Sequence, residues 1–237
     1  MSCVASLHLG TSGFSYPEWR GIFYPERLPA AKMLAEYATR LNAVELNNTF
    51  FRFPRPEAIA SWMAATSDGF RFCLKAQRSL TYSNPKFPRG AAAADFGSRL
   101  AAFGGRTGPV LIQFPPAFKK DLAALDELLG SLGHSAAVEF RDQGWLGKDT
   151  YEVARAHGAA IVVTDQEDWP RAPRVESAPF AYYRLRRDYS EAEVRAWAGE
   201  IRSELRARGE VHVFLRHAVE APQRALVLRE ALSAEVA

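Results

Sequence analysis

Charged and polar side chains alternate with apolar ones in several short, strand-like segments of this chain of 237 residues. In AVEFRDQGW, Glu139 and Arg141 alternate with apolar neighbours, and in AVELNN the same is true of Glu45 and Asn47. Successive side chains of a β-strand point to opposite faces, so each segment would carry one polar face. A carboxylate can take a proton from water, and a guanidinium can hold phosphate through two parallel hydrogen bonds. The pattern therefore predicts a site that binds an anion and activates water beside it.

Further polar residues fall near the carboxyl ends of other strand-like segments. Lys75 follows FCL, Gln113 lies in LIQF, and Arg184 lies in YYRLR. In a barrel of parallel strands these ends meet at one mouth, where active sites are built. The loops after the first two segments add aromatic rings and arginine, which can stack on flat rings, bases or sugars. The predicted site has Glu45 and Glu139 as catalytic carboxylates and, as substrate-binding residues, Tyr16, Trp19, Asn47, Arg52, Lys75, Gln113, Arg141, Trp145 and Arg184.

A purely structural explanation of these charges is pairing across the barrel. Glu45 would then pair with Lys75, or Glu139 with Arg184, and the pairs would fill the upper layer of the interior. Buried ion pairs are weak sources of stability, because the cost of desolvating both ions roughly cancels their attraction. A barrel that needed only stability could use valine, isoleucine and leucine there. The number of ionisable groups at strand ends therefore favours a site over packing.

The polar residues need a scaffold that brings the ends of several strands together. Apolar, β-branched runs alternate along the chain with segments of helical periodicity. This order favours a closed (β/α)8 barrel of the TIM type over an open doubly wound sheet. The segment GTSGFS also lacks the GxGxxG pattern that is typical of an open nucleotide-binding sheet. The eight candidate strands span residues 4–10, 43–48, 70–76, 109–114, 136–141, 159–165, 180–186 and 211–217.

The α/β barrel is expected to be irregular between its sixth and seventh strands. Residues 166–179 contain three prolines and are too short and broken for a full crossover helix, so this helix should be missing or shortened. The spacing of Ser190 and Glu193, by contrast, predicts a capping box at the start of an amphipathic helix. No repeat, low-complexity tract or interdomain linker is evident. Residues 1–237 are therefore predicted to form a single domain.

Charge and cysteine content narrow the class of protein. The chain has 30 basic and 27 acidic residues, and the formal net charge of +3 permits an anionic ligand but falls short of a nucleic-acid-binding signature. Cys3 and Cys73 are far apart and have no metal-ligand spacing, which is typical of a reduced, cytosolic protein. No signal peptide precedes the first strand, and no apolar run approaches the roughly 18 residues that span a bilayer. We expect a cytoplasmic protein without a membrane partner.

Six ordered motifs cover nearly the whole chain: GTSGFSYPEWRGIFYP, VELNNTFFRFP, FCLKAQRSLTY, LIQFPPAF, VEFRDQGW and YYRLR. In this order and spacing they resemble the YecE-like family, domain of unknown function 72. The resemblance implies a TIM-type barrel, in agreement with the strand count, and supplies no reaction. The family's motif positions match here at Gly10, Ser12, Gly13, Tyr16, Trp19, Glu45, Asn47, Thr49, Phe50, Lys75, Gln113, Pro115, Pro116, Glu139, Arg141, Trp145 and Arg184.

The chain departs from the family pattern at three strand ends. After the third strand the family usually has Thr-His, and here Tyr82 takes the place of the histidine. After the seventh the family commonly shows Arg-Leu-His-Gly, and here Arg186 and Arg187 follow Leu185. The eighth ends in Arg216 and His217, where the family tends to be acidic or rich in amides. The resemblance therefore implies a divergent member with an altered ligand preference.

The first functional hypothesis is a hydrolase-like or transferase-like enzyme that acts on an anionic substrate, preferably a phosphate ester or a nucleic-acid fragment. Lys75, Arg141 and Arg184 would hold the anion. Glu139 or Glu45 would act as general base for water. The alternative from another class is a non-catalytic barrel that binds a nucleic acid or a small anionic ligand.

Two further chemistries are weaker expectations. A glycoside hydrolase would use Glu45 and Glu139, but strands two and five lie nearly opposite, and nearby cations would lower the pKa of the general acid. The five histidines show no HxH or HExxH spacing. A divalent metal on Glu45, Glu139 and Asp165 would compete with arginine and lysine for the same oxygens. No cofactor is therefore predicted, and the oligomeric state is left open.

Overall fold

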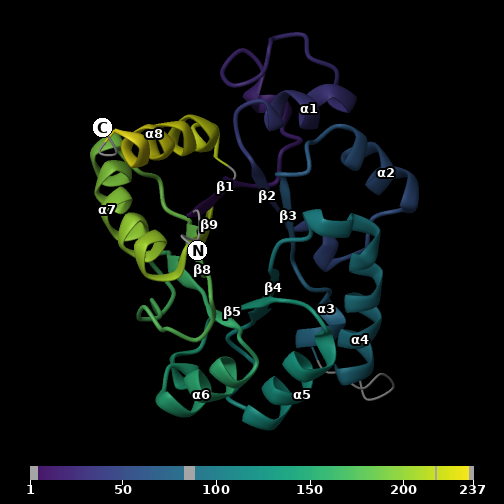
Figure 1. Ribbon diagram of the computed structural model, residues 1–237, viewed down its shortest axis with the longest axis vertical. Helices are drawn as coiled ribbons and strands as arrows, with labels where there is room; N and C mark the ends of the chain where they lie inside the picture. The colour runs from purple at the N-terminus through teal and green to yellow at the C-terminus, as the bar shows by residue number, and fades with distance from the viewer. Residues whose placement is uncertain (1–4, 83–88, 217, 235–237) are drawn as a thin grey trace.

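The chain folds into parallel β-strands at the centre with α-helices around them (Figure 1). The computed structural model describes residues 5–82, 89–216 and 218–234. In this described part, no helix has the length and hydrophobicity to cross a membrane. The strands are β1 (Ser6–Ser12), β2 (Ala43–Leu46), β3 (Arg71–Leu74), β4 (Val110–Phe114), β5 (Ala136–Phe140), β6 (Ala160–Ile161), β7 (Val163–Asp165), β8 (Ala181–Leu185) and β9 (Glu210–Leu215). The helices are α1 (Met33–Ala38), α2 (Pro56–Ala64), α3 (Arg78–Thr81), α4 (Arg89–Leu100), α5 (Leu122–Leu132), α6 (Lys148–Ala156), α7 (Glu191–Arg208) and α8 (Ala221–Ser233), with short 3-10 turns η1 (Pro17–Trp19), η2 (Ala30–Lys32), η3 (Asn48–Phe50), η4 (Ala101–Arg106) and η5 (Gln143–Trp145).

Strand β1 pairs with strands from both ends of the sequence. It runs parallel to β2, with Gly10 opposite Ala43, and parallel to β9, with Ser6 opposite Glu210. The hydrogen-bonded order is β3-β2-β1-β9-β8-β7 in one sheet and β4-β5-β6 in a second. Segments that are distant in the sequence therefore lie side by side at the centre of the fold (Figure 1).

Two backbone connections link the sheets. On one side a bridge joins Lys75 to Leu111, and the amide of Ala76 donates to the carbonyl of Leu111 at 2.8 Å. On the other side β6 and β7 form one run that only Val162 interrupts, and its amide donates to the carbonyl of Val138 at 2.9 Å. If β6 and β7 are taken as one strand, eight parallel strands follow one another, as the sequence predicts. The predicted TIM-type α/β arrangement is confirmed.

Alternation along the strands divides the buried side chains into two sets. In β4, Val110, Ile112 and Phe114 pack in the main core with residues of the helices. Leu111 belongs instead to a second apolar cluster of residues from several strands. Gln113 shares the face of Leu111 because it lies two residues further along the strand. The inward face thus changes from apolar to polar toward the carboxyl end.

Two local predictions about the helices are confirmed. At the start of α7, the amide of Glu193 donates to Oγ of Ser190 at 3.3 Å, and the amide of Ser190 donates to the Glu193 carboxylate at 2.8 Å. This is the capping box that the spacing predicts. Residues 166–179, all of them described, contain no helix between β7 and β8. The proline-rich sequence replaces the crossover helix with irregular chain.

Gly10 of β1 lies close to Ala43 of β2 and to Tyr37 of α1. A Cβ atom here would lie 1.9 Å from the carbonyl oxygen of Ala43 and 2.8 Å from the hydroxyl oxygen of Tyr37. Those two atoms are already bonded, because the Tyr37 hydroxyl donates to that carbonyl at 2.9 Å. We expect Gly10→Ala to lower the free energy of unfolding by about 1–3 kcal/mol or more, as overpacking does. Urea unfolding measures the change.

Gly199→Ala on the exposed side of α7 is the matched control for this prediction. Nothing lies within 4 Å of the added Cβ atom. Alanine in a helix interior is favoured over glycine by roughly 0.5–1 kcal/mol, so this variant should be slightly more stable than the wild type. A Gly10→Ala protein as stable as the wild type would contradict the close approach of β1 and β2.

Candidate functional site

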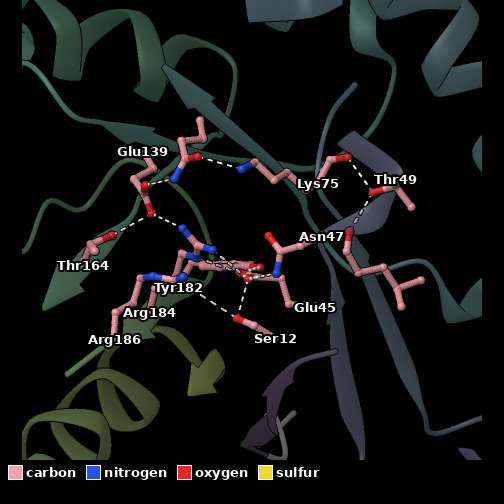
Figure 2. A network of polar contacts seen from close by, with 12 residues as sticks. Ser12, Glu45, Asn47, Thr49, Lys75, Glu139, Thr164, Tyr182, Arg184 and Arg186 are labelled. Atoms are coloured by element: carbon pink, nitrogen blue, oxygen red, sulfur yellow. Dashed lines mark hydrogen bonds and ion pairs between the residues drawn. The ribbon is translucent and has the colours of Figure 1, made fainter. Parts of the chain in front are cut away.

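A buried ion-pair network lies near the carboxyl ends of the strands, with Arg184 of β8 at its centre (Figure 2). Its Nε and Nη2 donate to Oε2 and Oε1 of Glu45 in β2 at 2.9 and 2.8 Å. Its Nη1 donates to Oε2 of Glu139 in β5 at 2.5 Å. The three residues are 0%, 1% and 2% exposed in the order Glu45, Arg184 and Glu139. Pairing across the barrel, the purely structural explanation, predicts the pair of Glu139 with Arg184, and this pair is present. The other predicted pair is absent, because Glu45 pairs with Arg184 and not with Lys75.

Glu45 is surrounded by hydrogen-bond donors. Oγ of Ser12 donates to it at 2.8 Å, Nδ2 of Asn47 at 3.0 Å and the hydroxyl of Tyr182 at 3.0 Å. With the two bonds from Arg184, its carboxylate accepts five hydrogen bonds. Burial by itself raises the pKa of Glu45, but the charge and the hydrogen bonds of Arg184 outweigh burial and bring the pKa below its usual value.

Glu139 is bonded in a similar way. Nε2 of Gln113 donates to its Oε1, and Nε of Arg141 donates to the same oxygen at 3.3 Å. Its Oε2 accepts from the hydroxyl of Thr164 at 2.8 Å and from Arg184. Burial opposes ionisation, but the charge and hydrogen bonds of Arg184 outweigh it and lower the pKa of Glu139 to about 2.

The state of these carboxylates decides what they can do chemically. A general base works best when its pKa lies near the operating pH and when it can reach the proton it removes. Glu45 and Glu139 have a depressed pKa, are 2% exposed or less, and already accept several hydrogen bonds each. These properties suit two fixed anions that orient Arg184, and they do not suit the predicted role of general base.

Lys75 follows β3 and adds a further cation to this region. Its Nζ donates to Oε1 of Gln113 at 2.7 Å and lies 4.6 Å from the centre of the Phe50 ring. Burial, followed by the charges of Arg184 and Arg141, lowers the pKa of Lys75 to about 8. Lys75 therefore exchanges its proton much closer to neutral pH than the two carboxylates do.

Two more arginines adjoin the carboxylates. Nη1 of Arg186 donates to Oγ of Ser12 at 3.4 Å, while its Nε is buried without a hydrogen-bond partner among the described residues. Burial and the charge of Arg184 lower the pKa of Arg186 to about 10. The guanidinium carbon of Arg141 lies 3.4 Å from the centre of the Trp169 ring.

We call Glu45, Lys75, Glu139, Arg141, Arg184 and Arg186 the Arg184 network. In this set, positive charge exceeds negative charge. Two carboxylates face four cationic side chains, so two positive charges are left without a carboxylate of their own. Anions are the ligands that would balance this excess.

Comparison with known proteins assigns the chain to a family. The model of a family described as a protein of unknown function, DUF72, matches residues 8–237. The chain belongs to the DUF72 family. The resemblance seen in the sequence motifs is thereby confirmed.

Relatives of known structure show the same architecture. A DUF72 family protein from Thermotoga maritima MSB8 superposes with a TM-score of 0.85 at 27% identity, over 96% of this chain and 99% of that chain. A second, from Enterococcus faecalis V583, gives a TM-score of 0.81 at 19% identity, over 96% of each chain. The UPF0759 protein YecE of Escherichia coli strain K12 is 29% identical over 127 residues, which is 53% of this chain and 44% of that protein. The match thus spans less than half the length of this curated relative, and the solved DUF72 structures share the TIM-barrel-like fold.

Two tryptophans of the DUF72 motifs, Trp19 and Trp145, lie in the hydrophobic core. Both are fully buried, and their Nε1 groups donate to the backbone carbonyls of Ala218 and Phe118 at 3.0 and 2.9 Å. Trp145 stacks on the outward-facing ring of Phe140, with centroids 4.6 Å apart. The prediction that both rings line the pocket is wrong, because each indole buries its apolar surface once its N–H has a partner.

Two other expected residues do not join the network. Asp165 accepts hydrogen bonds from Nε of Arg187 at 2.9 Å and from the hydroxyl of Tyr189 at 2.7 Å. Asp165, which the sequence suggests beside Glu45 and Glu139 as a possible metal ligand, does not lie with them, because alternation in β7 turns Thr164 inward and Asp165 away. Arg52 is exposed on the loop that follows η3.

A cavity of about 460 Å³, which is within the size range of small-molecule sites, is lined by residues from the loop after β1, the end of β2 and the helices α1 and α2, and by none of the six network residues. Asn47 lines this cavity and also donates to Glu45, so it connects the two. Tyr16 lines it as well, and its hydroxyl donates to the carbonyl of Ser12 at 2.6 Å. Trp62 adds an aromatic wall. Tyr16 and Asn47 thus both lie beside a ligand-sized hollow.

Some members of the site were left out of the predicted set. Ser12, Thr164 and Tyr182 all donate to network carboxylates, and alternation along their strands places each on the inward face. That alternation was a usable signal for all three. Trp169 lies in the irregular segment after β7, where no periodicity indicates which way a side chain points.

The departures from the DUF72 pattern fall around the same region. Arg186 belongs to the network itself. Tyr82 is 40% exposed, and its ring centroid lies 6.1 Å from that of Phe50. Arg216 pairs with an exposed aspartate at 2.8 Å, and His217 lies outside the described residues.

Proposed function

We propose that the Arg184 network binds an anionic ligand, a phosphate ester or a nucleic-acid fragment, at the carboxyl ends of the strands. The observation that carries the proposal is the excess of positive charge around carboxylates that already have several donors each. Lys75, Arg141 and Arg186 supply the charge for binding. Arg184 orients the cluster instead of contacting ligand, because its Nε, Nη1 and Nη2 all donate to carboxylates and its side chain is 1% exposed.

Aromatic rings near the network favour a ligand that carries a flat ring as well as an anion. The Arg141 guanidinium stacks on Trp169, and the Lys75 ammonium lies over Phe50. Phe51 and Tyr82 are 81% and 40% exposed, and both rings contact that of Phe50. Guanidinium groups bind phosphate in a bidentate manner, and exposed rings stack on bases. A nucleotide-like ligand would use both features.

Hydrolysis of the bound ester is the finer form of this proposal. The depressed pKa values of Glu45 and Glu139 disfavour both as general bases, so proton transfer is assigned to Lys75, whose pKa is about 8. A glycoside hydrolase needs a carboxylic acid with a raised pKa, and the shifts of Glu45 and Glu139 have the opposite sign. These pKa shifts therefore favour a reaction of an anionic ester over the hydrolysis of a glycosidic bond.

The proposal predicts an affinity that depends on salt and on pH. Nucleoside monophosphates, aryl phosphates and short single-stranded oligonucleotides serve as probes for calorimetry, fluorescence anisotropy and turnover assays. We expect Arg141→Met and Arg186→Met each to weaken binding about tenfold or more, because each removes charged hydrogen bonds worth about 1.5–3 kcal/mol. Binding should weaken as pH rises through about 8, because Lys75 then loses its proton. It should also weaken as salt concentration rises.

Arg195→Met is the matched control, because this half-exposed arginine lies on α7, on the outer layer of helices. It should bind the probes as the wild type does. Absence of binding, or binding that does not respond to salt, would contradict the anion proposal. Binding without turnover would contradict hydrolysis and leave a binding protein, and turnover that is unchanged in Lys75→Met would contradict the assignment of proton transfer to Lys75.

A further inference from the structure

A second cluster of ligand-type side chains lies at the amino-terminal ends of the strands, away from the Arg184 network. His8 is near the start of β1, and Glu210 and His212 are at the start of β9. The two strands are paired in parallel, and His8 lies directly opposite His212 in their register. Strand pairing thus brings His8, near one end of the sequence, beside Glu210 and His212, which lie near the other end.

The geometry of the cluster is compact. Nε2 of His212 lies 2.8 Å from Oε1 of Glu210, and Nε2 of His8 lies 3.6 Å from the same oxygen. One ligand atom from each residue lies within 4.8 Å of the others, and the imidazole rings stack with centroids 4.6 Å apart. His8 and His212 are 7% and 0% exposed, whereas the Glu210 side chain is 43% exposed. The cluster is buried on its imidazole side and accessible on its carboxylate side.

We propose that His8, Glu210 and His212 form a binding site for a transition-metal ion of the Zn2+ type. Two imidazole nitrogens and one carboxylate oxygen, with a fourth position left for water, are a common ligand set for Zn2+. The same set suits Mg2+ and Ca2+ poorly, because those ions prefer oxygen ligands. Ligands lie about 2.0–2.2 Å from a bound zinc ion, so the atoms that are 2.8 and 3.6 Å apart need only small side-chain movements.

The two imidazoles are available to an ion. Nδ1 of His8 is buried without a hydrogen-bond partner among the described residues, so no hydrogen bond at this nitrogen fixes the tautomer of the ring, and Nε2 can be the unprotonated nitrogen. Burial, and then the charge of His212, lowers the pKa of His8 to about 4, and burial also lowers the pKa of His212. Both rings are therefore neutral near pH 7 and keep a lone pair for coordination.

The surroundings of the cluster support His212 as a ligand. Sγ of Cys73 in β3 lies 3.7 Å from Nδ1 of His212. When Nε2 binds an ion, the single ring proton resides on Nδ1 and points to this sulfur, and such contacts orient metal-binding imidazoles. The positive charge of Arg71 opposes a cation here. Hydrogen bonds from its Nη1 to the carbonyls of Asp68 and Phe70, at 2.8 and 3.1 Å, hold this guanidinium on the backbone.

Equilibrium dialysis of the full chain against Zn2+, with metal analysis, tests the proposal. We expect one equivalent of Zn2+ per chain, and we expect Mg2+ to compete poorly. His8→Gln and Glu210→Gln should each raise the Kd at least about tenfold, because each removes a ligand. Zn2+ should also raise the Tm of the wild type by mass action and have little effect on the Tm of these variants. Substitution of Co2+ for Zn2+ adds a visible spectrum that reports the coordination geometry.

His157→Gln is the matched control, because His157 also pairs with a carboxylate, that of Asp126 at 2.7 Å, on the exposed surface. It should bind Zn2+ as the wild type does. If a histidine variant fails to fold, the Kd of Glu210→Gln tests the site, because Glu210 is partly exposed and its replacement should leave the fold intact. Near-ultraviolet circular dichroism checks the fold of this variant. Absence of stoichiometric Zn2+ binding, or equal affinity in Glu210→Gln and the wild type, would overturn the proposal.

Discussion

Replacement of Arg184 by methionine is expected to lower the free energy of unfolding by about 3–5 kcal/mol, as does the removal of one partner from other buried ion pairs. The variant would leave Glu45 and Glu139 buried, with at most 2% of their surface exposed and without the guanidinium that bonds to both. Two buried carboxylates would then lack the positive charge that lies between them, and among the described residues only Glu139 would keep an ion pair, the one with Arg141. Urea unfolding at pH 7, followed by far-ultraviolet circular dichroism, measures the loss.

Arg171→Met is the matched control for this variant. Arg171 pairs with Glu200 at 3.2 Å, and the two side chains are 49% and 29% exposed. Exposed ion pairs contribute about 0–1 kcal/mol, so the control should unfold almost as the wild type does. A loss below about 1 kcal/mol for Arg184→Met would contradict the buried network, because it would equal the effect of a surface pair.

Replacement of Glu139 by glutamine is expected to flatten the dependence of stability on acid pH. Burial opposes ionisation of Glu139, yet Arg184 lowers its pKa from 4.5 to about 2 in the folded chain. A carboxyl group with a depressed folded pKa stabilises the fold above its unfolded pKa, and this contribution is lost as pH falls through the folded value. Between pH 5 and pH 2 the wild type should therefore lose on the order of 3 kcal/mol from this group, at 1.36 kcal/mol per pKa unit. Glutamine cannot contribute to that loss.

Unfolding in urea at pH 7, 5, 3 and 2 gives the two profiles. Glu57→Gln, an exposed acid at the start of α2, is the matched control and should follow the wild type. Glu45→Gln should change the profile in the same direction as Glu139→Gln, because the pKa of Glu45 is also lowered. Parallel profiles for the wild type and Glu139→Gln would contradict a depressed pKa in the folded protein.

The location of the site could be predicted from the sequence because it depends on strand alternation. Polar residues that share the inward face of parallel strands must meet at one end, and Glu45, Glu139 and Arg184 do so. The chemical state of the carboxylates could not be predicted in the same way. It depends on donors such as Ser12 and Tyr182, which reach Glu45 from other strands.

The placement of the loop aromatics shows a second limit. Trp19 and Trp145 are large and amphipathic, so the sequence alone is compatible with a binding surface or with the core. Their N–H groups found carbonyl acceptors at Ala218 and Phe118, and this outcome depends on tertiary packing. Arg52, in a similar loop, is exposed. In an irregular segment, the type of a residue therefore does not predict whether its side chain points to the core or to solvent.

The histidine cluster was missed for a topological reason. A search for HxH or HExxH finds only ligands that share one strand or helix. His8 and His212 instead meet because their strands pair in register, with Glu210 two residues before His212. In a barrel, the first and last strands are neighbours. Two ligands such as His8 and His212, one on each of these strands, therefore have no short spacing in the sequence that a motif search could find.

The pairing of β1 with β9 also governs how the chain can be made. β1 leaves the ribosome roughly 200 residues before β9, so one edge of β1 has no native partner during most of translation. Such an edge offers unpaired backbone groups to other chains. Contacts this distant form slowly because loop-closure entropy opposes them. Closure at this seam is therefore expected to come late in folding, and the preceding interval is when the nascent chain is most prone to aggregate.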